Sequence, residues 1–181
     1  DNDDVNANRY ATPFWLACGG VQFSALTCHA CSRKATRYDI WHSLSLAIPK
    51  VQSSVEALLT AHWGEEALND ECPHAQCMVR NRRTHNTQLE RWPRVLVLHL
   101  KRWKVVSAVP FVQEKISTPV SYETMFAIAL NVQYHLRGVV EHHGAVGSGH
   151  YTSIVRAPDN FWYSCDDERS PQLITTRDAL D

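Results

Sequence analysis

The last third of the chain restricts the fold most strongly, because its residue pattern predicts β-strands in a set order. Tyr134–Val140 is an apolar run, and Glu141–Gly149 has the three glycines and two histidines of a loop. His150–Arg156 and Phe161–Cys165 are rich in β-forming residues, and Ala157–Asn160 between them signals a turn. A chain with this segment is therefore expected to contain an antiparallel hairpin.

The register of that hairpin brings an imidazole close to a carboxylate. If Arg156 faces Phe161, then His150 faces Asp167, and a turn of a different length would place Asp166 opposite instead. Facing Cβ atoms lie about 4.5–5.5 Å apart, which is close enough for a hydrogen bond. A histidine held by a carboxylate is the base and orienting half of a nucleophilic triad. The alternative is a surface contact in a glycine-containing loop.

Composition limits the class of protein. A chain of 181 residues with 44% hydrophobic and 20% charged residues is expected to form one domain with a core. The formal net charge of −1 argues against a nucleic-acid partner, and no apolar run has membrane-spanning length. The polar, acidic start is unlike a signal peptide. Because it lacks methionine, we expect this end to be a cut, a processed terminus or the boundary of an expressed fragment.

Cysteine spacing indicates a metal site. Four of the six cysteines fall in two close pairs, Cys28 with Cys31 and Cys72 with Cys77. This spacing suits a tetrahedral four-thiolate zinc site with a structural role, because no coordination position is left open. The looser second pair makes His29 and His74 possible substitute ligands. The alternative is four free thiols, although so few cysteines suit a reducing compartment and a metal better than a disulfide scaffold.

Hydrophobic periodicity predicts the remaining elements. Two strands should flank the first cysteine pair as a hairpin, and Ser54–Trp63 should form a short amphipathic helix after an S-x-x-E capping box. The continuous run Val95–Leu98 favours a central strand buried on both faces. A further strand is expected at Trp41–Pro49. Ser107–Pro119 contains two prolines and should be an excursion from the sheet, and Thr124–Leu130 is ambiguous between helix and strand.

Several ordered motifs resemble the ubiquitin-specific proteases, which are papain-like cysteine deubiquitinases. They are GVVEHHGAVGSGHY followed by FWYSCDD, WPRVLVLHLKRW, CHAC, SLSLAIP and ECPHAQC. The resemblance runs from about Phe14 to Asp167, with Trp103 where the family usually has phenylalanine. The family's GNTCYMNS-like segment, which carries the nucleophilic cysteine, has no counterpart in this chain.

The resemblance implies a fold and a domain organisation. The expected class is α+β, a papain-like cysteine protease with a mostly antiparallel β palm, zinc-bearing β fingers, few helices and no thumb. Residues 1–13 would be a mobile amino-terminal segment, and residues 14–181 would form the palm and fingers, with the fingers at about 21–40 and 66–92. The expected location is the cytoplasm or nucleus, and the expected partners are ubiquitin or a ubiquitinated protein and the missing thumb.

The resemblance also implies roles for individual residues. His150 would be the general base, Asp166 would orient it, and Asp167 would support the oxyanion or substrate side. The ubiquitin tail would lie against Gly144, Gly147, Gly149 and Tyr151.

The expected activity is hydrolysis of the bond after the Gly-Gly tail of ubiquitin, with the nucleophile outside this chain. The chain alone would then be inactive, and Cys18 and Cys165 would be structural. The alternatives are an inactive ubiquitin-binding module and a zinc-stabilised interaction domain unrelated to ubiquitin. The intact histidine and aspartates favour the enzyme over the inactive binding module. A zinc-stabilised interaction domain would explain only the cysteines.

Overall fold

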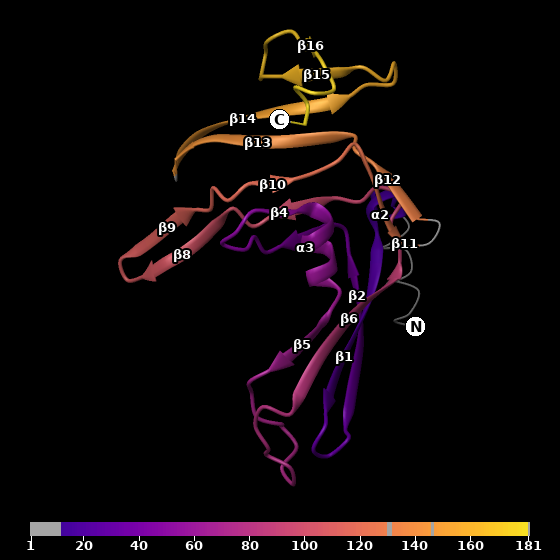
Figure 1. Cartoon of the computed structure of the whole chain (residues 1–181), viewed down its shortest axis with the longest axis vertical. Helices are drawn as coiled ribbons and strands as arrows, with labels where there is room; N and C mark the ends of the chain where they lie inside the picture. Colours follow the sequence, from indigo (N-terminus) through magenta and orange to yellow (C-terminus); the bar gives the residue numbers. More distant parts are fainter. Residues whose placement is uncertain (1–11, 130–131, 146, 181) are drawn as a thin grey trace. The chain divides into compact units, whose positions relative to one another are not determined.

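A computed structural model describes residues 12–129, 132–145 and 147–180 (Figure 1). The chain divides into two compact units, each described by itself. The first unit comprises the chain up to Ala47 together with Ala57–Leu100, and the second comprises Ile48–Glu56 and the chain from Lys101 onward.

In its described residues, the first unit contains one short helix, one longer helix and six strands. Their bounds are α2 Pro13–Cys18, β1 Gly20–Cys28, β2 Lys34–Trp41, β3 Leu44–Leu46, α3 Val55–His62, β5 Glu65–Leu68, β6 Arg83–Arg91 and β7 Leu98–Leu100. The first two residues of α3 are counted with the second unit.

In its described residues, the second unit consists of strands and their connections, together with the start of α3. The bounds are β4 Ser53–Ser54, β8 Trp103–Ala108, β9 Phe111–Lys115, β10 Val120–Ser121, β11 Met125–Ala129, β12 Val132–His135, β13 Gly138–Ala145, β14 Ser148–Arg156, β15 Trp162–Cys165 and β16 Gln172–Ile174.

The expected hairpin around the first cysteine pair is confirmed, and it belongs to a four-stranded antiparallel sheet. The strand order is β2-β1-β6-β5, and Figure 1 shows β1, β2 and β6 as long neighbouring strands. The register pairs Gly20 with Trp41, and a Cβ on Gly20 would lie 2.3 Å from the Trp41 ring. Because Gly20 has no side chain, the Trp41 indole can pack against the backbone at the base of the hairpin.

Two strand predictions in the first unit are wrong in extent. The strand expected at Trp41–Pro49 is limited to β3, which pairs in parallel with β7. The run Val95–Leu98 is not a central strand, since Val95 and Val97 are 48% and 40% exposed. The N–H of Val95 instead donates to the carbonyl of Ala17, at 2.9 Å. The Val95 N–H is therefore bonded to a carbonyl of helix α2, and strand pairing begins only at Leu98.

The predicted helix is present as α3, one residue shorter at each end than expected. Val55, Leu58 and Leu59 form its buried stripe, as the helical spacing of apolar residues predicted. Ser53 and Ser54 form the short strand β4, which pairs in parallel with β10. The serines that suggested a helix cap therefore lie in a sheet.

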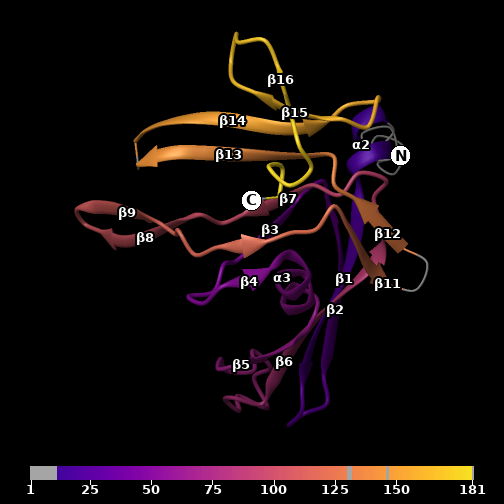
Figure 2. The same ribbon diagram turned by 45° about the horizontal axis from the view of Figure 1, so that its top comes forward.

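The carboxyl-terminal sheet has the order β13-β14-β15-β16 and is antiparallel throughout (Figure 2). The loop expected at Glu141–Gly149 is wrong, because β13 and β14 continue pairing as far as Ala145 and Ser148. Positive φ angles of +106° at Gly144 and +80° at Gly147 allow this tight reversal. Likewise the single run expected at Tyr134–Val140 is divided between β12 and β13.

The two uncertain segments of the sequence are both β-structure. The proline-containing excursion contains most of the antiparallel hairpin β8–β9, in which Trp103 faces Lys115. The ambiguous segment forms β11, which pairs with β12. The structure is thus mostly antiparallel β with few helices, which confirms the expected fold class.

The boundaries expected for the fingers and for the amino-terminal segment stay predictions. Residues 1–11 lie outside the described residues, and helix α2 already begins at Pro13. Among the described residues, no helix is both long and apolar enough to span a membrane.

Candidate functional site

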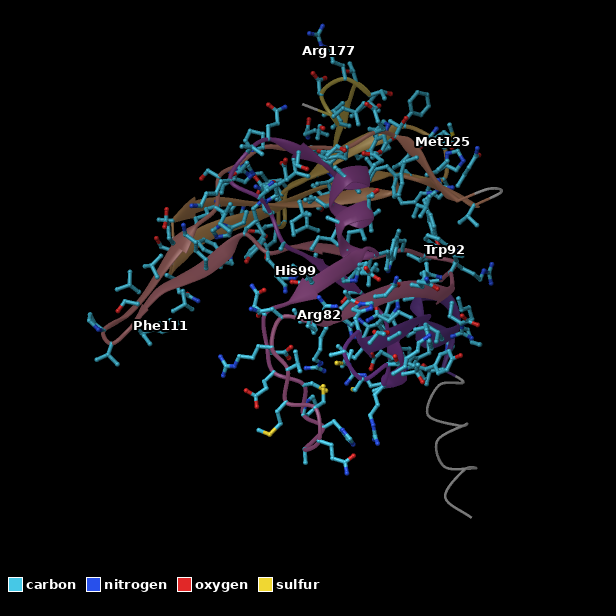
Figure 3. The ribbon with its side chains drawn as sticks, turned by 60° about the horizontal axis from the view of Figure 1, so that its bottom comes forward. Arg82, Trp92, His99, Phe111, Met125 and Arg177 are labelled. Atoms are coloured by element: carbon cyan, nitrogen blue, oxygen red, sulfur yellow. The ribbon has the colours of Figure 1, made fainter. Side chains whose placement is uncertain are left out.

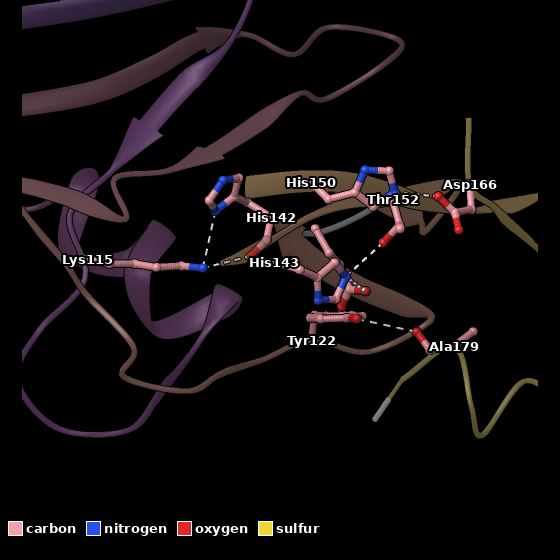
Figure 4. A network of polar contacts seen from close by, with 9 residues as sticks. Lys115, Tyr122, His142, His143, His150, Thr152, Asp166 and Ala179 are labelled. Atoms are coloured by element: carbon pink, nitrogen blue, oxygen red, sulfur yellow. Dashed lines mark hydrogen bonds and ion pairs between the residues drawn. The ribbon is translucent and has the colours of Figure 1, made fainter. Parts of the chain in front are cut away.

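The carboxyl-terminal sheet brings His150 and Asp166 together (Figure 4). His150 lies in β14, and Asp166 directly follows the last residue of β15. The His150 Nε2 atom is hydrogen-bonded to Asp166 Oδ1. Asp167 lies on the other side of the ring, with Oδ2 at 3.7 Å from His150 Nδ1. The expected His150–Asp166 contact is therefore present, and the catalytic roles of these residues stay predictions.

The register that produces this contact differs from the expected one. Arg156 pairs with Trp162 rather than with Phe161, and the β14–β15 pairing ends at Ser153 and Cys165. Continued pairing would have placed residue 168 opposite position 150. Asp167 instead adopts a φ of +47°, which turns the chain as it leaves the sheet. Asp166 directly follows the last paired residue, and continued pairing would place it opposite Thr152. Its side chain therefore reaches the imidazole diagonally, two residues along β14.

Asp166 has a second partner that sequence reasoning missed. Arg169 Nη1 lies 2.9 Å from Asp166 Oδ2, and the Arg169 N–H donates to the Asp166 carbonyl at 3.0 Å. The hydrogen bond from His150, followed by the charge of Arg169, lowers the pKa of Asp166 below its ordinary value. The carboxylate is thus ionised at neutral pH. The one sequence signal for this pair was a cation three residues after an aspartate in a turn.

The contact selects one form of the imidazole. With Nε2–H donating to an ionised carboxylate, the neutral ring keeps its lone pair on Nδ1. The His150 side chain is 48% exposed, so this lone pair is accessible. His150, Asp166, Asp167, Glu168 and Arg169 line an open depression of about 1090 Å³. The arrangement can accept a proton from a nucleophile that enters the depression.

The glycines expected to bind a substrate tail have structural reasons of their own. Gly144 and Gly147 have positive φ, and a Cβ on Gly149 would lie 2.1 Å from His142 Nε2. Tyr151 is exposed, with its ring centroid 4.8 Å from that of His142. These residues form the turn end of the β13–β14 hairpin, and their role in binding a tail stays a prediction.

The first unit contains a candidate metal centre. The sulfur atoms of its four cysteines all lie within 4.8 Å of one another, and the group consists of Cys28, Cys31, Cys72 and Cys77. The Cys28–Cys77 and Cys31–Cys72 sulfurs are each 3.9 Å apart. A tetrahedral zinc ion with Zn–S bonds of about 2.3 Å would hold its sulfurs about 3.8 Å apart. The donor set and spacing therefore fit zinc.

Local backbone contacts fix the turns that carry two of the four cysteines. The Cys28 N–H donates to the Arg33 carbonyl at 2.9 Å, and the Cys77 N–H donates to the His74 carbonyl at 2.8 Å. The Cys31 backbone N–H lowers the pKa of the Cys28 thiol to about 6, which favours its thiolate. Burial and the neighbouring thiols instead raise the pKa of Cys72 and Cys77, so the fit to zinc rests on the sulfur geometry.

The two histidines considered as substitute ligands lie outside the four-sulfur group. The His29 ring contacts Thr84 Oγ1 at 3.0 Å, and the His29 N–H donates to the carbonyl of Arg82, which Figure 3 labels. The His74 backbone contacts the turn, since its carbonyl accepts from the Cys77 N–H, and its ring is not part of the group.

A family model described as "Ubiquitin carboxyl-terminal hydrolase" matches residues 9–178. The chain belongs to this family. The match covers both the carboxyl-terminal sheet and the four-cysteine group, and it confirms the resemblance to ubiquitin-specific proteases.

Individual relatives of the hydrolase family support the assignment. Chicken ubiquitin carboxyl-terminal hydrolase 2 is 31% identical over 160 residues, which cover 81% of this chain and 44% of that protein. Rat ubiquitin carboxyl-terminal hydrolase 21 is 28% identical over 171 residues, with coverages of 81% and 28%. The chain thus spans less than half the length of these curated relatives.

Solved structures show the same fold. A structure of the yeast SAGA DUB module with an Sgf73 mutant superposes with a TM-score of 0.85 at 21% identity, covering 99% of this chain and 43% of that one. The SAGA Ubp8/Sgf11/Sus1/Sgf73 DUB module bound to ubiquitin aldehyde gives a TM-score of 0.80 at 21% identity, covering 97% and 41%.

Proposed function

We propose that this chain is the histidine- and aspartate-bearing part of a cysteine deubiquitinase that hydrolyses the bond after the Gly-Gly tail of ubiquitin. The observation that carries the proposal is the His150–Asp166 contact, which leaves Nδ1 as the proton acceptor. The hydrolase family membership supports the reaction class.

In the proposed mechanism, His150 Nδ1 takes the proton from a cysteine thiol, and the thiolate attacks the carbonyl carbon of the last ubiquitin glycine. The imidazolium then gives this proton to the leaving amine, which leaves a thioester between ubiquitin and the enzyme. His150 next activates a water molecule that hydrolyses the thioester. Asp166 holds the ring orientation and stabilises the imidazolium in both steps.

Asp167 has a different place in the proposed mechanism. Its Oδ2 lies 3.7 Å from Nδ1, the nitrogen that would face the nucleophile, and its side chain is 74% exposed. This is the side from which thiol and substrate would approach. We assign Asp167 to support of the substrate or oxyanion side, and Asp166 to orientation of the base.

The nucleophile would come from sequence outside this chain. Four cysteines belong to the sulfur group, and two others remain. Cys18 is buried at the carboxyl end of the six-residue helix α2, where the helix dipole disfavours an anion. Cys165 is the residue directly before Asp166 in β15, and adjacent strand residues point to opposite faces. Neither residue has the setting of an activated thiol.

Ubiquitin is the proposed partner. A solved neighbour of this fold is bound to ubiquitin aldehyde, and the glycine-containing end of β13–β14 lies beside His150. Gly144, Gly147, Gly149 and exposed Tyr151 are proposed to contact the tail. Zinc held by the four cysteines would have a structural role, tying the β1–β2 turn to the segment before β6. Paired thiols of this kind suit the reducing cytoplasm or nucleus.

The test is fluorophore release from the carboxyl terminus of ubiquitin by the full-length protein that contains this chain. His150→Ala should abolish the release, and Asp166→Asn should reduce it by about 10³–10⁴-fold. His135→Ala, at an exposed position of β12, is the matched control and should leave the rate unchanged. A full-length protein that binds ubiquitin but releases no fluorophore would show the alternative function, an inactive ubiquitin-binding module.

A further inference from the structure

We infer that Lys115 is a positioning residue for His150, acting through the edge strand β13. The inference rests on the proposed function, in which His150 is the general base. Lys115 is the last residue of β9, and its ammonium reaches the hairpin that carries His150 (Figure 4).

The His150 backbone has support from one side only. In the described part of the chain, β14 pairs with β15 from Ser153 onward, so residues 148–152 pair with β13 alone. His143 of β13 lies directly opposite His150, between the His142–Tyr151 and Gly144–Gly149 pairs. The position of His150 therefore depends on the segment 142–144 of β13.

Lys115 binds the free edge of that segment. β13 is the outer strand of its sheet, and a Cβ on Gly149 would lie 2.6 Å from the His143 carbonyl oxygen, which places that oxygen on the β14 side. The carbonyls of His142 and Gly144 alternate with it along the strand. Lys115 Nζ donates to both, at 2.7 Å and 3.1 Å. The ammonium takes the place that a neighbouring strand would occupy.

A second path leads through the His142 ring. Lys115 Nζ also lies 3.2 Å from His142 Nδ1, and as a lysine it can only donate to this atom. The ring contacts Trp103 on one side and Tyr151 on another, with centroid separations of 5.4 Å and 4.8 Å. Its Nε2 atom occupies the space beside Gly149, the residue directly before His150.

The hairpin β8–β9 positions the Lys115 side chain toward segment 142–144 of β13. Trp103 and Lys115 face each other in its register, and the ammonium lies 5.8 Å from the centroid of the Trp103 ring. The tryptophan thus contacts both the cation and the imidazole that the cation holds. Together these contacts tie three strands to the short backbone segment that sets the His150 position.

The test compares Lys115→Met with a lysine on the same hairpin. Lys104 pairs with Glu114 at 2.9 Å and is half exposed, so Lys104→Met is the matched control. Lys115→Arg keeps a charged donor and should retain most of the wild-type behaviour. If Lys115→Met fails to fold, Lys115→Gln replaces it, because it keeps an amide donor without the charge.

The first readout is the ring ¹⁵N signals of His150, measured by NMR in this chain. Wild type should show a ring held as the Nε2–H form by Asp166, and Lys115→Met should show the two nitrogens averaged. Amide exchange in 142–151 should rise by about tenfold in Lys115→Met, while exchange in the β1–β6 ladder stays unchanged. Unchanged ring signals and exchange would overturn the inference.

The second readout is ubiquitin-fluorophore hydrolysis by the full-length protein. Lys115→Met should lower kcat by about tenfold to a hundredfold with KM within about twofold, because misplacing the base affects the chemical step more than binding. Lys115→Arg should keep most of the wild-type kcat, and Lys104→Met should have the kcat and KM of wild type. A normal kcat in Lys115→Met would overturn the inference. An inactive wild type would refute the proposed function instead, and the ring signals alone would then decide the role of Lys115.

Discussion

Asp166 uses both carboxylate oxygens, one for the His150 ring and one for the Arg169 guanidinium. The first contact sets the imidazole tautomer, and the second holds the carboxylate through its other oxygen. Arg169 lies three residues after Asp166 in the turn that leaves β15. An exposed arginine beside a proposed catalytic carboxylate is thus expected to affect its ionisation more than the stability of the fold.

Arg169→Gln should raise the pKa of Asp166, because it removes a nearby positive charge. Because the folded pKa of Asp166 lies below its ordinary value of 3.8, its ionised form stabilises the protein at pH values above 3.8. This stabilisation is lost as the pH falls through the lowered pKa. The measurement is a carboxyl ¹³C titration by NMR. Arg37→Gln is the control, since Arg37 pairs with Asp39 in the other unit. An identical titration of Asp166 in Arg169→Gln would contradict the assignment.

At the scale of secondary structure, the β13–β14 hairpin depends on the absence of side chains at its turn end. Gly149 must leave room for the His142 ring, whereas a Cβ on Gly147 would meet no atom within 4 Å. Gly147 is constrained only by its φ of +80°. Two glycines only two residues apart are therefore required for different physical reasons.

Gly149→Ala should destabilise the chain by about 1–3 kcal/mol, because the new methyl group overlaps the His142 imidazole. Gly147→Ala should cost about 1–2 kcal/mol through backbone strain alone. Urea unfolding measures both changes, and the ¹⁵N signals of the His142 ring should move only in Gly149→Ala. Equal ring signals in the two variants would argue against the overlap.

The four-cysteine group is a second element-scale feature, since it joins segments far apart in sequence. Cys28→Ser should eliminate one zinc ion per chain and lower the thermal midpoint by roughly 10 °C, because metal binding contributes to folding. Metal analysis and calorimetry provide the two measurements. Cys165→Ser, outside the group, should keep its zinc. A metal-free wild type that is as stable as Cys28→Ser would contradict the prediction.

At the scale of the whole molecule, the hydrolase family model matches residues 9–178 of this chain, whereas the chain spans less than half the length of the relatives compared with it. It contains the proposed base, its proposed orienting carboxylate and a candidate metal-binding group. The proposed reaction also requires a nucleophile, which this chain does not provide in an activated setting.

The chain alone should therefore release no fluorophore from ubiquitin above the low background that a site without a nucleophile supports. Adding a segment from the full-length protein that carries the nucleophilic cysteine should restore the release. Cys18→Ala tests the remaining amino-terminal thiol. Turnover by the lone chain that disappears in Cys18→Ala would show that Cys18 is the nucleophile.

The sequence by itself determined the local features of this protein: the hairpin around Cys28 and Cys31, helix α3, and the pairing of His150 with an aspartate. These depend on spacing, turn residues and periodicity within short segments, or on motifs with a known order. The tertiary structure decided the β14–β15 register, the end of pairing at Cys165 and the reach of Lys115 to β13. Strand pairing depends on contacts between distant segments, and a shift of one residue exchanges the two faces of a strand. A local pattern therefore predicted which residues meet, but not the register that places Asp166 diagonally from His150.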